Sequence, residues 1–347
     1  MLTGHKAGDN TQLVALADAL GWPYETLHFR YRATELLSNR LLGVTLAGID
    51  RAASSPLSPP WPELILTAGR RNEPLARWIQ RQSGGNTRLV HLGRPWAPLD
   101  AFDLIVTTPQ YFLPEQPNIL HNQLPIHGVT PERLARAAAS WTARLGHLPR
   151  PYTAVLVGGD SGPFVYTVEK GAQLGQQVNA LAEQLGGSLL VTDSARTPHK
   201  VFTAFEQALT APAFIHRWRR DSSDNPYLAY LAMADRLVVT GESMSMLTEA
   251  ASTGKPLYIF DPGDSGPWWR YAHSLRFKPL THRLAMRFAA RRMHRDIGNI
   301  QRQLVDSGRA VWLGQDFPEG RQLPAPDDVQ RAAKQVRALF AGSGSGG

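Results

Sequence analysis

Short apolar runs alternate with amphipathic stretches along almost the whole chain. Runs such as residues 63–67, 88–92 and 103–107 are rich in Val, Ile and Leu, which is typical of strands buried on both faces of a parallel sheet. Stretches such as residues 73–82 instead repeat their apolar positions at helical spacing. Strands and helices that alternate in this way predict the α/β class, with parallel sheets covered by helices.

A second alternating series begins after Pro149-Arg150-Pro151, which we interpret as an interdomain linker. A chain of 347 residues is long enough for two domains. We therefore expect Rossmann-like domains at residues 1–149 and 150–315, followed by a terminal helix and a flexible Gly/Ser tail in residues 316–347. In the second domain, strands are expected at residues 153–157, 188–192, 213–216, 237–240 and 257–260, with helices between them and a basic helix at residues 281–305.

The N-terminus departs from this pattern. Only Met1-Leu2-Thr3 precede a polar turn that contains glycine, so either the first strand is very short or the chain begins late. We expect a polar loop over residues 3–12. In it, His5 or Asp9 is a candidate general base that deprotonates an acceptor hydroxyl. Asp9 or Asn10 could equally be a helix N-cap.

Composition excludes several kinds of chemistry. The chain has no cysteine, which excludes disulfides, thiolate zinc sites, iron–sulfur clusters and cysteine nucleophiles. There is no His-Glu-x-x-His motif, and the 11 histidines show no metal-ligand spacing. An Asp-x-Asp pair, which would hold Mg²⁺ on a sugar diphosphate, is also absent. We therefore expect a metal-independent site that uses a helix dipole, hydroxyls and arginine.

The charge distribution indicates an anionic partner. The net charge is +8, and basic residues concentrate between Arg270 and Arg302. This run suits an anionic membrane surface, or it is simply a solvated helix face. Nucleic acid is not expected, because no nucleic-acid-binding motif accompanies the charge. With no apolar stretch of about 20 residues and no signal peptide, we expect a cytoplasmic protein, peripheral at the inner membrane.

The segment with the most specific chemistry is residues 237–260, which has the pattern strand, turn, helix, glycine, strand. Gly241 and Ser243 lie where the strand turns into the helix, and free N–H groups and the helix dipole make that end an anion site. Glu249 lies one turn after the Ser245 hydroxyl on the same helix face. The helix end would hold a diphosphate and Glu249 a ribose diol; the alternative is an ordinary N-cap with a solvated Glu249. The candidate nucleotide-sugar residues in this segment are Gly241, Ser243, Ser245, Met246 and Glu249.

Two more turns follow predicted strands of the same domain. Gly158 and Gly159 would let a backbone approach a phosphate closely. In the next turn, Ser194 precedes Arg196, which could make a bidentate phosphate contact. Each turn alone is also compatible with an ordinary connection. Because parallel strands end at one edge of a sheet, we expect these turns and Gly241 to converge on one crevice.

A turn in the N-terminal domain carries two arginines after the strand expected at residues 63–67. Arg70 and Arg71 either bind an acidic acceptor or are solvated.

These segments together give the chain a family resemblance. The matching segments are residues 4–12, 67–71, 157–160, 194–198, 225–227 and 238–256. The chain resembles the bacterial relatives of the plant mitochondrial fission (elongated mitochondria) protein, a family also described as proposed lipooligosaccharide outer-core glycosyltransferases. The resemblance implies the GT-B architecture, which is two Rossmann-like domains facing a cleft. The N-terminal domain would bind the acceptor, the C-terminal domain the nucleotide sugar, and the terminal helix would pack back on the N-terminal domain.

The resemblance also implies roles for individual residues. In GT-B enzymes a glutamate in the position of Glu249 commonly holds the ribose, and nearby hydroxyls or amides hold the diphosphate. The chain departs from the family pattern in its shortened first strand and in Glu242, which stands where relatives have an aspartate. The roles extend to Glu249, Ser243, Ser245, Gly159 and Arg196.

Three functions remain open on this reading. The first is a metal-independent glycosyltransferase that moves a sugar from a nucleoside diphosphate sugar to an acceptor, such as a lipid-linked or lipooligosaccharide core glycan of the cell envelope. It needs no cofactor besides its substrate. The second is a nucleotide-sugar epimerase on the same fold, and the third is a non-catalytic GT-B scaffold that binds partners.

Overall fold

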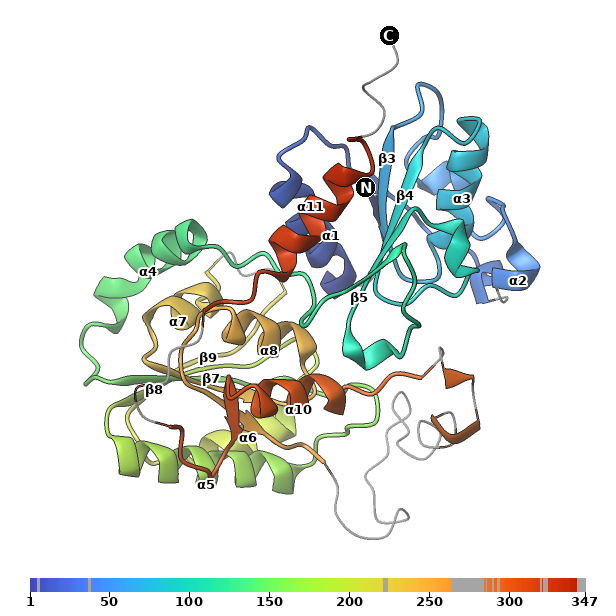
Figure 1. Cartoon of the computed structure of the whole chain (residues 1–347). Helices are drawn as coiled ribbons and strands as arrows, with labels where there is room; N and C mark the ends of the chain where they lie inside the picture. The colour runs from blue at the N-terminus through green and yellow to red at the C-terminus, as the bar shows by residue number, and fades with distance from the viewer. Residues whose placement is uncertain are drawn as a thin grey trace. The chain divides into compact units, whose positions relative to one another are not determined.

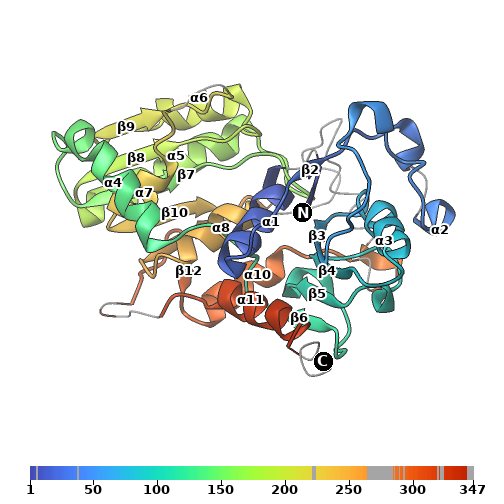
Figure 2. The same ribbon diagram turned by 90° about the horizontal axis from the view of Figure 1, so that it is seen from above.

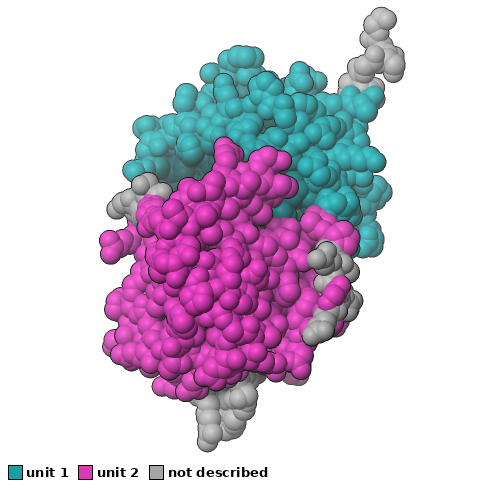
Figure 3. Space-filling model, turned by 90° about the vertical axis from the view of Figure 1, so that its left-hand side faces the viewer, with its two compact units in different colours: residues 1–128, 290–296, 327–347 teal, residues 129–289, 297–326 magenta. Residues whose placement is uncertain are grey.

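The structure is a computed structural model, and its described residues divide into two units. It describes all residues except 5–6, 37–38, 221–223, 264–283, 285, 289, 292–293, 319, 321–323 and 342–347. Unit 1 comprises Met1–Gly128, Ala290–Asp296 and Asp327–Gly347 (Figure 3). Unit 2 comprises Val129–Ala289 and Ile297–Pro326.

Unit 1 is built on a parallel sheet with the strand order β2-β1-β3-β4-β5-β6. Helices α1 (Ala7–Leu20) and α11 (Asp328–Ala338) pack side by side on one face, and α3 (Glu73–Gln82) covers the other (Figure 1, Figure 2). Along β4, Leu89 packs on the α3 side and Val90 on the α1 side, so both faces of the strand are apolar. The remaining elements are β1 (Leu2–Thr3), β2 (Leu27–His28), α2 (Asn39–Leu42), β3 (Leu64–Ala68), β4 (Arg88–Leu92), β5 (Leu104–Thr107) and β6 (Ile119–His121).

Unit 2 contains a second parallel sheet, with the order β12-β11-β10-β7-β8-β9. Numbered from β7, this is the order 3-2-1-4-5-6 of dinucleotide-binding Rossmann domains. Helices α5 (Val168–Leu185) and α6 (His199–Gln207) pack on one face, while α7 (Tyr227–Met233) and α8 (Met244–Ala251) lie on the other (Figure 1). The remaining elements are α4 (Pro131–Leu145), β7 (Tyr152–Leu156), β8 (Ser188–Thr192), β9 (Ala213–His216), β10 (Arg236–Thr240), β11 (Leu257–Phe260), α10 (Gly298–Asp306) and β12 (Ala310–Trp312).

The predicted fold class, α/β with two Rossmann-like domains, is confirmed by these two sheets. The division of the chain differs from the predicted one, because the units separate at Gly128 and Val129 and not at residues 149 and 150. The reason is that α4 packs against α7, with the rings of Trp141 and Tyr230 edge to face at 6.4 Å. The segment Pro149-Arg150-Pro151 therefore lies inside unit 2 and leads into β7.

Two local predictions are corrected. Helix α1 begins at Ala7, so Asp9 and Asn10 belong to its first turn and not to a loop. The basic helix predicted at residues 281–305 is not continuous, because residues 294–296 are not helical and α10 begins only at Gly298. The first strand, β1, has two residues. None of the helices in the described ranges is both long and apolar enough to cross a membrane.

The start of α11 supplies a test of how the end of the chain is attached to unit 1. Asp328 is 1% exposed, and its side chain accepts hydrogen bonds from the backbone N–H groups of Gln123, at 2.8 Å, and Leu124, at 3.0 Å. Asp328→Ala leaves both donors without this acceptor, so we expect it to lower the free energy of unfolding by roughly 2–4 kcal/mol in urea titrations. The matched control is Asp327→Ala, since Asp327 is exposed and makes no side-chain cap hydrogen bond. Equal losses in the two variants would contradict the assignment.

Candidate functional site

The carboxyl edge of the unit 2 sheet carries the residues that the sequence singled out. Strands β7 and β10 are neighbours in the sheet, but the chain leaves β7 towards β8 on one side and leaves β10 towards β11 on the other. Loops that depart in opposite directions leave a crevice at such a switch point, which is where α/β sheets bind ligands. We call residues 157–161, 193–197 and 241–249 the switch-point site.

Hydrogen bonds join the three loops of the switch-point site. The N–H of Gly158 donates to Thr240 Oγ1 at 2.7 Å, which links the loop after β7 to the end of β10. Thr197 Oγ1 donates to the carbonyl of Gly158 at 2.6 Å, and Arg196 Nη1 donates to the carbonyl of Asp160 at 3.2 Å. The Ser194 hydroxyl lies 2.9 Å from Thr197 Oγ1 within its own turn. The structure therefore brings the three predicted turns together at one edge.

The two glycines after β7 have a structural role in this arrangement. A Cβ on Gly158 would lie 1.8 Å from Glu242 Oε1, and a Cβ on Gly159 would lie 2.1 Å from the carbonyl oxygen of Arg196. No side chain fits at either position. These glycines let the protein's own loops approach each other, whatever ligand the edge receives.

Glu242 is a buried carboxyl group between the loops of the switch-point site. The residue is 1% exposed, and its carboxylate accepts a hydrogen bond from the Tyr166 hydroxyl at 2.6 Å. The side chain therefore packs into the protein against Gly158. Burial raises the pKa of Glu242 to about 7, although the hydrogen bond from Tyr166 opposes the shift.

The beginning of α8 presents backbone and hydroxyl donors. Ser243 is the N-cap residue and is 5% exposed, but its side chain makes no capping hydrogen bond. Ser245 is exposed and Met246 is half-buried. The first N–H groups of any helix have no helical carbonyl to bind, so this end attracts anions. Gln301 Nε2 donates to the carbonyl of Gly241 at 2.6 Å and fixes the preceding turn.

Glu249 is held by a partner that the sequence reasoning did not assign. The Tyr227 hydroxyl donates a hydrogen bond to Glu249 Oε2. Burial raises the pKa of Glu249, and burial together with the Glu249 charge raises that of Tyr227 well above its ordinary value. Within the described ranges, Glu249 Oε1 has no hydrogen-bond partner. Tyr227 therefore orients the carboxylate and leaves one oxygen to accept further hydrogen bonds.

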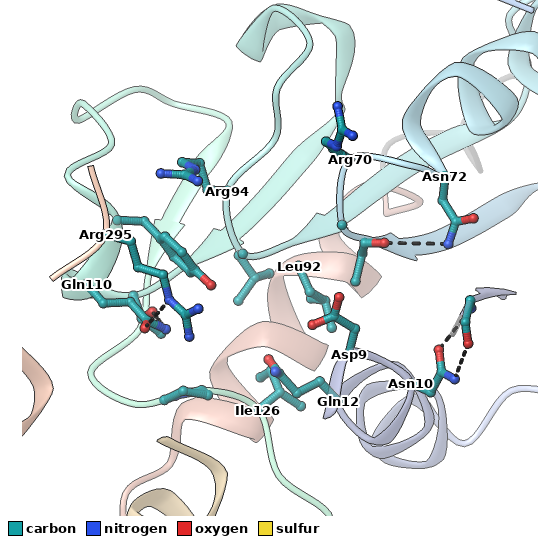
Figure 4. A pocket seen from close by; sticks show the side chains of 18 of the residues that line it. Asp9, Asn10, Gln12, Arg70, Asn72, Leu92, Arg94, Gln110, Ile126 and Arg295 are labelled. Carbon is teal, nitrogen blue, oxygen red and sulfur yellow. Dashed lines mark hydrogen bonds between the residues drawn. The ribbon is translucent and has the colours of Figure 1, made fainter. Parts of the chain in front are cut away.

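Unit 1 holds a pocket of about 310 Å³ at the carboxyl edge of its own sheet (Figure 4). The loops after β1 and β3 contribute Gly4 and Gly69, and these neighbouring strands form the switch point of this sheet. The four arginines that line it suggest the name arginine pocket. Its lining is Gly4, Asp9, Asn10, Gln12, Tyr31, Ala68–Asn72, Leu92–Arg94, Trp96, Val106, Thr108, Gln110, Tyr111, Asn122, Leu124–Ile126 and Arg295.

The first turn of α1 contributes Asp9 and Asn10 to the arginine pocket. The Asp9 carboxylate is directed into the pocket (Figure 4). Asn10 is committed to the preceding turn, because Gly4 N–H donates to Asn10 Oδ1 at 3.1 Å and Asn10 Nδ2 donates to the Gly4 carbonyl at 2.8 Å. His5, the other candidate base, lies outside the described residues.

The arginines of the pocket stack on its aromatic side chains. Arg70 lies over Trp96, with 5.3 Å between Cζ and the ring centroid, and Arg71 lies 5.5 Å over the ring of Tyr31. Arg94 lies between two rings, 5.8 Å from that of Trp96 and 5.6 Å from that of Tyr111. Cation–π contacts of this kind help to hold guanidinium groups in place.

Arg94 and Arg295 are pocket residues that the sequence reasoning missed. Arg94 follows β4 and donates from Nη1 to the carbonyl of His294 at 2.9 Å. Arg295 Nε donates to Gln110 Oε1 at 3.3 Å, and its Cζ lies 5.8 Å from the Tyr111 ring. Burial lowers the pKa of Arg94, and the charge of Arg295 adds to that effect. A turn after a predicted strand could have indicated Arg94, but Arg295 is distant in sequence.

The basic run from Arg270 to Arg302 thus contributes a residue to a cavity. Arg287, Arg291 and Arg302 are exposed. Arg270, Arg276, Lys278, Arg283 and Arg292 lie outside the described residues. Among described side chains, no group of three or more His, Asp or Glu residues could hold a metal ion.

The chain is similar to several known proteins. A model of the family described as mitochondrial fission ELM1 matches residues 7–340. The mitochondrial fission protein ELM1 of Arabidopsis thaliana is 27% identical over 329 residues, which are 88% of this chain and 70% of that protein. A Rickettsia prowazekii protein with the name Uncharacterized protein RP120 is 26% identical over 297 residues, which are 76% of this chain and 82% of the relative. The crystal structure of Acinetobacter baumannii MurG has a TM-score of 0.46 and 14% identity, covering 97% of this chain and 98% of that one.

The buried Glu242 carboxyl predicts a pH dependence of stability. Its pKa is about 7 in the folded protein against an ordinary value of 4.5. Between these values the folded state keeps a proton that the unfolded state releases, so raising the pH from about 5 to about 8 costs roughly 3 kcal/mol of stability. Glu242→Gln removes this titration and keeps an acceptor for Tyr166. We expect the variant to gain stability relative to the unsubstituted protein as the pH rises, measured by urea unfolding at each pH. A difference that stays constant over this range would show that the Glu242 pKa is not raised.

Proposed function

The chain belongs to the mitochondrial fission ELM1 family, and we propose that it is a metal-independent glycosyltransferase that uses a nucleoside diphosphate sugar as donor. Unit 2 would bind the donor and unit 1 the acceptor, in a GT-B arrangement. The observation that carries the proposal is the Glu249 carboxylate, held by Tyr227 on the helix that begins at the switch point of the unit 2 sheet.

The switch-point site offers the groups that a nucleoside diphosphate needs. The first N–H groups of α8 and the Ser245 hydroxyl would bind the diphosphate oxygens. Glu249 Oε1 would accept hydrogen bonds from the ribose hydroxyls, while Tyr227 holds the carboxylate in place through Oε2. Arg196, which is anchored on the Asp160 carbonyl, would add positive charge near the same edge.

These groups also suit the chemistry of sugar transfer. The bond between the sugar anomeric carbon and the diphosphate oxygen breaks, and a bond from that carbon to an acceptor oxygen forms. The acceptor hydroxyl gives its proton to a base, for which Asp9 is the candidate. The diphosphate leaves with the bonding electron pair, and donors already directed at that position stabilise its charge without a metal ion.

Removal of the Glu249 carboxylate tests the donor site. We expect Glu249→Ala to weaken nucleoside diphosphate binding by about 10- to 100-fold, because two hydrogen bonds to a charged acceptor are lost. Calorimetric titration with UDP, GDP, ADP and dTDP would measure this. The matched control is Glu183→Ala, which removes an exposed glutamate from α5 in the same unit.

Tyr227→Phe separates orientation from direct contact. It keeps the carboxylate but removes the hydroxyl that holds it, so we expect a smaller loss of affinity, about 3- to 10-fold.

If no nucleotide binds to the unsubstituted protein, the transferase proposal fails and a non-catalytic scaffold is favoured. If a bound nucleotide sugar is converted to its epimer without any acceptor, the protein is an epimerase.

A further inference from the structure

The arginine pocket of unit 1 has a strong excess of positive charge. Arg70, Arg71, Arg94 and Arg295 are its charged residues in the described part of the chain, apart from one carboxylate, Asp9. The arginines come from the loops after β3 and β4 and from the segment Ala290–Asp296. Three separate segments thus bring like charges to the lining of one cavity.

The geometry keeps these guanidinium groups at the pocket. Arg94 and Arg295 both pack on Tyr111. Arg94 donates a hydrogen bond to the carbonyl of His294, and Arg295 donates one to the side chain of Gln110. Gln110 is itself buried and donates to Thr108 Oγ1 at 3.2 Å. Guanidinium groups fixed in this way lose little freedom when they bind oxygen atoms, which favours a planar, bidentate contact with an anion.

The rest of the pocket suits an organic molecule that carries the anion. Leu92, Val106, Leu124 and Ile126 supply apolar surface, and Trp96 is partly exposed at the rim. The volume lies at the lower end of the range of about 300–1,000 Å³ that small-molecule sites occupy. A sugar ring, with its apolar faces, matches this lining better than a bare inorganic ion.

We infer that the arginine pocket binds the phosphate group of a phosphorylated saccharide, which would be the acceptor of the proposed transfer. A phosphate monoester carries up to two negative charges, and a diphosphate can carry more. Such a group matches the four arginines of the pocket better than the single charge of a carboxylate. The inference names the acceptor class and in that respect rests on the proposed function. Phosphate binding itself does not depend on sugar transfer.

The experiment measures pyrophosphate binding by calorimetry in a series of charge variants. We expect Arg94→Gln with Arg295→Gln to weaken binding by about 10- to 100-fold. Arg94→Lys keeps the positive charge but not the bidentate guanidinium group, so it should lose less pyrophosphate affinity than Arg94→Gln alone. Asp9→Asn removes the opposing carboxylate and should strengthen binding, a change of opposite sign that a misfolded variant cannot produce. Arg88→Gln is the control, because Arg88 pairs with Asp103 and does not line the pocket.

A second set of measurements distinguishes this site from the donor site. Pyrophosphate could also bind at the beginning of α8, so Arg196→Gln and Glu249→Ala are titrated in parallel. Loss of pyrophosphate binding in Arg196→Gln but not in the Arg94 and Arg295 variants overturns the inference, as does the absence of any binding. If pyrophosphate binding depends on Arg94 and Arg295 while no nucleotide binds, the inference stands and the transferase proposal fails.

Vesicles identify the source of the phosphate. Phosphatidylcholine vesicles that contain a polyprenyl phosphate are compared with vesicles that contain phosphatidylserine and with pyrophosphate in solution. Binding to the polyprenyl phosphate vesicles that is lost in the double arginine variant indicates a lipid-borne phosphate. Binding of pyrophosphate without such vesicle binding indicates a water-borne one. The inference is overturned if both kinds of vesicle bind equally, the arginine variants leave this binding unchanged, and no pyrophosphate binding depends on the pocket. The protein would then bind anionic membrane surfaces in general.

Discussion

The arrangement of both candidate sites depends on the parallel pairing of strands. In a parallel sheet all strands end at the same edge, so the loops that follow them meet whatever their separation in sequence. Where the chain reverses its direction across the sheet, neighbouring loops diverge and leave a crevice. In unit 1 this point lies between β1 and β3, beside Asp9 and Gly69, and in unit 2 between β7 and β10, beside Gly158 and Ser243. Each unit therefore has its polar chemistry where its topology changes direction.

Many polar groups at these sheet edges form hydrogen bonds to the protein's own loops. Gly158 has no room for a side chain because the Glu242 carboxylate packs against it. The hydrogen bond from Tyr166 replaces one that this buried carboxylate would otherwise make to water. Tyr227 likewise donates to one oxygen of Glu249, whereas the second oxygen of Glu242 also accepts a hydrogen bond from Thr240 Oγ1, at 3.4 Å. Both oxygens of Glu242 are therefore bonded within the protein, and Glu249 is the carboxylate to which we assign the proposed donor. An aspartate in place of Glu242 would be one methylene shorter and would not reach Tyr166 in the same way.

One arginine of the basic run contributes its charge to a cavity in unit 1. A run of arginines between Arg270 and Arg302 suggests a surface for an anionic membrane when it is read along the sequence. Arg295 of this run instead packs on Tyr111 beside Arg94 and lines a cavity with them. Its charge is therefore combined with that of residues about 200 positions earlier in the chain, as the hydrogen bond from Arg94 to His294 also shows. The charge of this pocket therefore depends on which segments the fold brings together, and not on one basic segment of the sequence.

The sequence alone determined the α/β class, the two Rossmann-like domains and most strands, because apolar periodicity reports which faces are buried. It also identified the turns around Gly158, Arg196 and Ser243, since each follows a strand directly. Only the tertiary structure decided that Glu249 binds Tyr227 and that Arg295 joins Arg94. It also placed α4 in unit 2 and began α1 at Ala7. Those outcomes depend on which elements pack together, and periodicity along one segment contains no information about the segment that it meets.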